Sequence, residues 1–194
     1  MHELAILSEE SLISKRIWEC LDDEDKSRAA KIGKQDIDFA LERLVWSGIL
    51  QTDERELAER EFKRFIFLIG MGVRPIAMIS PKIDELWHQL VLFTQRYQAF
   101  CFDTVGFFVH HTPETPTEPI PVEAASNCFD AYECVYGNVP SIWFDRMGQD
   151  LKDFYAQRPL GRKPHVRWSG WTGEESRKFD GLARLRSLSQ SVPR

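Results

Sequence analysis

The chain has 194 residues, of which 43% are hydrophobic and 28% charged, and its formal net charge is −5. These values are typical of a soluble globular domain and exclude a disordered chain. The longest nearly apolar run, residues 65–73, is too short to cross a bilayer, and the N-terminal residues lack the apolar core of a signal peptide. We therefore expect a cytoplasmic protein with no membrane contact.

The four cysteines form neither a CxxC pair nor a dense framework, so free thiols are expected rather than disulfides. Charge is distributed unevenly. From residue 158 onward there are nine Lys or Arg and three Asp or Glu, whereas the preceding part is strongly acidic. This basic extension either lies on the acidic body or binds an acidic partner. We divide the chain into a helical domain, 1–157, and a basic, tryptophan-containing extension, 158–194.

Helical patterns dominate the domain. Ser8 is a plausible N-cap for a first helix, and apolar spacing predicts a second helix near 35–48. A third helix begins at about Thr52 with acidic and basic residues in its first turn, and its apolar positions form one buried stripe. The GMGVRP segment at 70–75 ends it.

The second half follows the same pattern. Ser80–Pro81 begins a central helix that is expected to continue to about 103. Residues 112–122 contain four prolines and form an extended loop, and a helix near 123–136 ends at Gly137. A short helix at 147–156 precedes an irregular tail. The predicted fold is mostly α: a single compact helical domain with a proline-rich loop and an irregular basic C-terminal tail.

Three of the five histidines lie within the segment 84–113. Asp84 and His88 are one helical turn apart, so the carboxylate can orient the imidazole and leave its other nitrogen free. His110 and His111 follow, and because adjacent side chains diverge in an extended chain, only one of them is expected to reach His88. On a continuous helix, Tyr97 and Cys101 point away from the Asp84–His88 pair.

Three interpretations of this cluster stay open. It forms a structural network, or it binds zinc or iron through ligands drawn from Asp84, His88, His110 and His111. Alternatively it is a metal-free acid–base site whose catalytic candidates are Asp84, His88 and, if the helix bends, Tyr97. No phosphate-binding loop, nucleophile elbow or HExxH motif is present.

The tail segment 162–173 combines basic residues with two tryptophans. Such tryptophans serve as anchors on a protein surface, whereas the acidic whole chain argues against nucleic acid as the main ligand. The candidate partner-binding residues are Trp168, Trp171, Arg162, Lys163 and Arg167.

The run from Ile83 to Pro113 resembles the glycine-rich domain-containing protein-like family. The resemblance covers about residues 55–145, although the chain has no glycine-rich segment. It implies a helical fold and a coherent unit of Asp84, His88, His110 and His111, and it implies no particular reaction. The matching positions are Asp84, Trp87–His88, Thr94, Tyr97, Phe100–Cys101, Gly106–Phe108, His110–His111 and Pro113.

Because no complete catalytic set is present, we interpret the chain first as a helical module that binds a protein partner. The alternatives are a metal-dependent or acid–base enzyme centred on Asp84, His88, His110 and His111, and a purely structural motif. The sequence indicates no oligomeric state.

Overall fold

The computed structural model describes residues 13, 15–115, 117, 119–145, 147–157 and 181–190. Regular structure within these ranges is helical, which confirms the mostly α architecture. No helix in the described ranges is long and apolar enough to span a membrane. The elements are α2 (Lys15–Trp18), α3 (Asp23–Gly33), α4 (Asp38–Trp46), η1 (Thr52–Glu54), α5 (Arg55–Gly70), α6 (Pro81–Leu92), α7 (Thr94–Thr104), α8 (Val122–Tyr136), η2 (Ser141–Trp143), α9 (Gln149–Gln157) and α11 (Gly181–Gln190).

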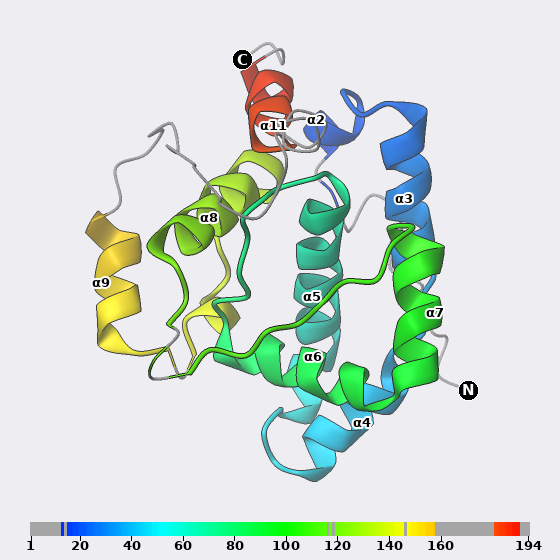
Figure 1. The fold of residues 1–194 in the computed structure, drawn as a ribbon, viewed down its shortest axis with the longest axis vertical. Helices are drawn as coiled ribbons and strands as arrows, with labels where there is room; N and C mark the ends of the chain where they lie inside the picture. The colour runs from blue at the N-terminus through cyan, green and yellow to red at the C-terminus, as the bar shows by residue number, and fades with distance from the viewer. Residues whose placement is uncertain are drawn as a thin grey trace.

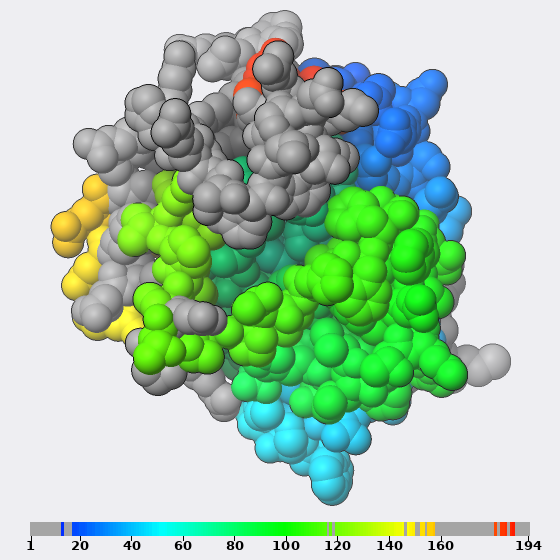
Figure 2. All heavy atoms as spheres, in the orientation of Figure 1, coloured from blue at the N-terminus to red at the C-terminus, as the bar shows by residue number. Residues whose placement is uncertain are grey.

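Helix α5 is the centre of the fold (Figure 1). Its apolar side chains recur at helical spacing, and nearly all of them are buried because α3, α6 and α8 pack around it. The long connection between α7 and α8 crosses the face of the molecule in front of α5 and includes the proline-rich segment. In the space-filling view, α7 and this connection cover much of the same face, with α4 at its lower edge (Figure 2).

Several predicted elements are present with small shifts in their ends. The predicted helices at 35–48, 123–136 and 147–156 correspond to α4, α8 and α9, and Gly137 ends α8 with a φ of 81°. The helix predicted from Thr52 begins as the short η1, which has a capping box between Gln51 and Glu54, and continues as α5. The helix predicted from Ser8 lies mostly outside the described residues.

The prediction of one continuous helix from 81 to about 103 is wrong. The chain breaks at Phe93, whose φ of −91° and ψ of 62° are not helical, and this residue separates α6 from α7. Phe93 packs edge-on against Phe39 of α4, with ring centroids 4.7 Å apart. The break lets α6 pack on α4 and α5 while α7 packs on α3, which one straight helix could not do.

Helix α3 was not predicted, although its signal is ordinary. Asp22 caps it by accepting a hydrogen bond from the Asp25 amide at 2.9 Å, and three acidic residues occupy its first turn. Its buried positions include Ala29 and Ile32, and the helix packs against α5 and α7.

The irregular tail also needs a correction, because residues 181–190 form helix α11, which packs against α8. Leu185 is buried in the core, and the Gly181 amide donates to the Gly72 carbonyl oxygen at 3.2 Å. The leucines at 182, 185 and 188 repeat at helical spacing, so this helix had a recognisable pattern in an otherwise polar segment.

Candidate metal-binding site

The N-terminal half of α6 supplies two of the site residues. Ser80 caps the helix through its hydroxyl, which accepts from the Ile83 amide at 3.3 Å, and Pro81 occupies the first turn, as predicted. This fixes the start of α6 and therefore the face that carries Asp84 and His88. The distance between Asp84 Oδ2 and His88 Nε2 is 3.5 Å.

The third residue arrives from the connection after α7. Gly106 turns the chain with a φ of 84°, and the following residues lead back to α6. The His111 ring stacks on Trp87, with centroids 4.3 Å apart and planes at 14°, and its centroid lies 4.6 Å from that of His88. The expectation that only one histidine of the pair reaches His88 is confirmed, and that histidine is His111.

The Asp84 carboxylate approaches both imidazoles. Its Oδ1 is 3.4 Å from His111 Nε2, and one ligand atom from each of Asp84, His88 and His111 lies within 4.8 Å of the others. The His111 side chain is only 8% exposed, and its Nε2 makes no hydrogen bond. The side chains of Asp84 and His88 are 27% and 34% exposed, so one side of the cluster is open to solvent.

Burial within the cluster disfavours the charged forms of Asp84 and His111. Burial raises the pKa of Asp84 to about 6, and the charges of Glu85 and Glu114 act in the same direction, while His88 opposes them. Burial, followed by the proximity of His88, lowers the pKa of His111 to about 4. His111 is therefore a neutral imidazole at pH 7, the form that binds metals.

A second layer of contacts lies behind the cluster. The Trp87 indole N–H donates to the Tyr97 hydroxyl at 2.8 Å, and that hydroxyl donates to the Val109 carbonyl oxygen at 2.5 Å. Cys101 is buried beside Tyr97, and burial raises the pKa of both groups. Tyr97 and Cys101 thus pack behind the site and are not among its ligand atoms.

His110 and Tyr97 were also predicted as site residues, and neither is a ligand candidate in the described structure. His110 is exposed, and its ring contacts Phe108 edge-on. Tyr97, a catalytic candidate, has its hydroxyl proton bound to the Val109 carbonyl. Trp87 was not predicted as a site residue. Its position directly before His88 in the sequence was the one feature that could have indicated it. The partner-binding candidates Trp168, Trp171, Arg162, Lys163 and Arg167 lie outside the described residues.

Part of the chain is similar to a known protein family. Residues 42–125 match the model of a family described as UCP032817-like. The matched segment contains the central helix α5, both helices of the site and all three of its ligand candidates. No curated protein and no solved structure matches the chain. The family description names no activity, so the function must be argued from the site itself.

Proposed function

We propose that this protein binds a divalent transition-metal ion through Asp84, His88 and His111. The observation that carries the proposal is the buried His111 Nε2, which has no hydrogen-bond partner. It lies 3.4 Å from Asp84 Oδ1, and one ligand atom each from Asp84, His88 and His111 lies within 4.8 Å of the others, so one ion could contact all three. An unsatisfied buried polar atom costs roughly 1–3 kcal/mol, and a metal ion at this position would remove that cost.

The ligand types favour zinc or ferrous iron. Two imidazoles and one carboxylate suit these ions, whereas magnesium and calcium prefer oxygen ligands. Three protein ligands leave coordination positions unfilled, and the open side formed by Asp84 and His88 can supply water or a substrate group. Closed four-ligand sites are typical of structural zinc, so this arrangement supports the metal-dependent enzyme hypothesis over a purely structural motif.

The first test is elemental analysis of protein purified without a histidine tag. We expect near-stoichiometric zinc or iron in the parent protein and its loss in His88→Ala and His111→Ala. His110→Ala is a matched control, because it removes the neighbouring, exposed histidine and should leave the metal content unchanged. A folded parent that binds neither Zn²⁺ nor Fe²⁺ when supplied, or equal metal content in the two neighbouring variants, would reject the proposal.

The resemblance to the glycine-rich domain-containing protein-like family stays a proposal. It is supported by the way several residues of the shared pattern contact one another: Trp87 touches Tyr97 and His111, and Tyr97 lies beside Cys101. Residues scattered over 84–111 therefore form one local unit.

A protein-interaction role is a second proposal, and Trp46 favours it. This side chain, at the end of α4, is 88% exposed, and tryptophan is enriched at the energetic centres of interfaces. We expect Trp46→Ser to abolish recovery of a stoichiometric partner from the native host. Glu42→Ser, an exposed change on the same helix, is the control. Equal recovery with both variants would remove Trp46 from consideration.

A further inference from the structure

We propose that Trp87 and Tyr97 are positioning residues that hold His111 in the geometry required of a metal ligand. This inference rests on the proposed metal site and assigns a role to two residues that do not themselves bind the ion. Ligating histidines are ordinarily fixed by further contacts behind them, and loss of such contacts weakens metal binding by about 10- to 100-fold.

The need for positioning comes from the chain around His111. Asp84 and His88 are placed by a regular helix, but His111 lies in the connection between α7 and α8, outside any regular element. The residues that follow it are exposed, so they supply little packing. Two contacts nevertheless restrict His111 from the side of the core.

The first contact acts on the backbone. The Tyr97 hydroxyl donates to the carbonyl oxygen of Val109, two residues before His111. Tyr97 is 1% exposed, and its hydroxyl also accepts the Trp87 indole N–H, so its direction is fixed from both sides. The Val109 side chain is itself buried, which holds this part of the connection against the core.

The second contact acts on the imidazole ring. Trp87 presents its face to His111 and its N–H edge to Tyr97, so one indole contacts both the ligand and the group that holds the ligand's backbone. Trp87 is in turn held by edge-on contacts with Phe62 and Phe65 of α5, at centroid distances of 6.4 and 5.5 Å. The central helix therefore fixes the indole, and the indole fixes His111.

The experiment is a Zn²⁺ titration, using a competing chelator, of the parent and of Tyr97→Phe. The variant keeps the ring and loses the hydroxyl that bonds Val109, and we expect its affinity for Zn²⁺ to fall by about tenfold. Trp87→Phe, which keeps an aromatic ring against His111 but loses the N–H, should give a loss of similar size. Tyr136→Phe is the matched control, because its hydroxyl also donates to a backbone carbonyl, that of Arg64, away from the site.

A second measurement separates positioning from general loosening of the fold. In imidazole NMR spectra of the metal-free protein, Tyr97→Phe should shift or broaden the His111 resonances and leave those of His88 unchanged. Unchanged affinity, or equal changes at both histidines, would overturn the positioning role while leaving the metal site intact. A parent protein that binds no Zn²⁺ would instead reject the proposed function, and this inference with it.

Discussion

Glu61 is a fully buried carboxylate on α5, and its neighbours show how a single residue can hold several elements together. It accepts hydrogen bonds from the Trp143 indole N–H at 2.8 Å and from the Tyr132 hydroxyl, and it pairs with Arg64 at 2.9 Å. Glu61→Ala removes the acceptor that η2 and α8 share, and we expect the free energy of unfolding to fall by about 2–4 kcal/mol. Urea denaturation measures this change.

Glu56→Ala is the control for that prediction, since Glu56 is an exposed carboxylate in the first turn of the same helix. Its loss should cost at most about 1 kcal/mol through the helix dipole. Similar destabilisation by the two substitutions would show that the buried network contributes nothing beyond ordinary helix effects.

At the candidate site, the sequence pairs Asp84 with His88 on physical grounds, but it does not distinguish His111 from His110. The Asp84–His88 spacing fixes a contact on any helix, so the pair follows from local geometry alone. His111 comes from a loop, and its selection over His110 depends on which ring reaches the Trp87 face. Tertiary packing decides between the two histidines, and the spacing of residues along the sequence does not reveal it.

At the scale of elements, the helices with strong apolar periodicity were predictable and their junctions were not. The break between α6 and α7 occurs without glycine or proline, at the half-buried Phe93. This ring packs edge-on against Phe39 of α4, and the Arg43 guanidinium lies 5.9 Å from its centroid. The helix propensities of the residues around Phe93 do not predict that a helix ends there. The two helices separate because α4 and α3 offer packing surfaces in different directions.

The docking of α11 gives a prediction at the same scale. A Cβ added at Gly181 would lie 2.1 Å from the Met71 carbonyl oxygen and 2.7 Å from the Val73 amide nitrogen. Both are backbone atoms, so the clash could be relieved only by moving the main chain. Gly181→Ala should therefore displace the start of α11 and cost about 1–3 kcal/mol of docking energy. Hydrogen exchange of residues 181–190 measures the effect, and we expect it to become faster.

Gly148→Ala is the matched control, because a Cβ at Gly148 meets nothing within 4 Å. It should leave exchange in α11 unchanged. Protection of α11 that is equal in both variants would mean that the close backbone approach at Gly181 does not hold the helix.

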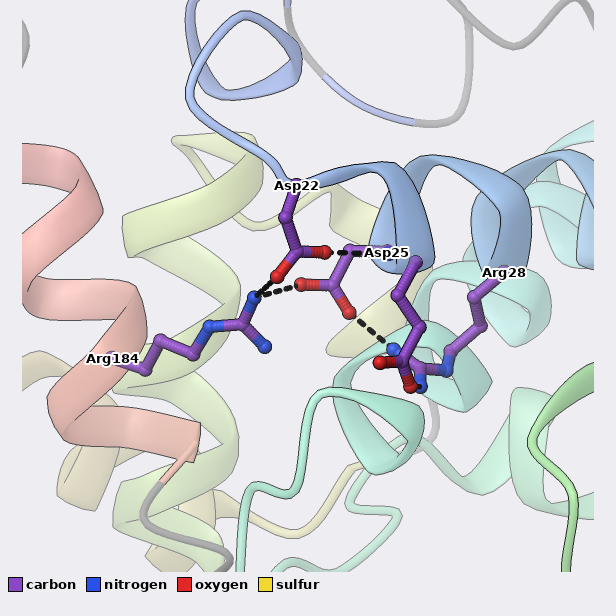
Figure 3. Close-up of polar contacts among 5 residues, drawn as sticks. Asp22, Asp25, Arg28 and Arg184 are labelled. Carbon is purple, nitrogen blue, oxygen red and sulfur yellow. Dashed lines mark hydrogen bonds and ion pairs between the residues drawn. The ribbon is translucent and has the colours of Figure 1, made fainter.

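At the scale of the whole molecule, an ion-pair cluster joins the last described helix to α3, near the beginning of the described chain. Arg184 of α11 reaches Asp22 and Asp25, and Arg28 approaches Asp25 from the other side (Figure 3). The distance from Arg184 Nη2 to Asp25 Oδ2 is 2.5 Å. Within residues 181–190, the described part of the basic extension, Arg184 thus pairs with two carboxylates of the acidic body. This contact agrees with the interpretation that the extension lies on the body.

The two carboxyls of this cluster respond to acid in opposite ways. The hydrogen bond from the Asp25 amide lowers the pKa of Asp22, so its stabilising contribution is present above 3.8 and is lost as pH falls through the lower folded value. Burial raises the pKa of Asp25, so ionising it costs stability as pH rises above 3.8, and the charge of Arg184 offsets part of that cost.

Arg184→Gln removes this offset, and its effect should therefore depend on pH. Where both carboxyls are ionised, we expect a loss of about 1 kcal/mol, kept small because the Arg184 side chain is 42% exposed and screened by solvent. As pH falls, Asp25, whose pKa is raised, gains its proton first, and Asp22, whose pKa is lowered, gains its proton last, so the difference from the parent should shrink towards zero. Arg55→Gln, which removes an arginine 3.1 Å from the exposed Asp38, should change stability by only a few tenths of a kcal/mol. Urea denaturation at several pH values measures both variants, and a difference for Arg184→Gln that persists unchanged in acid would show that its side chain acts through packing and not through charge.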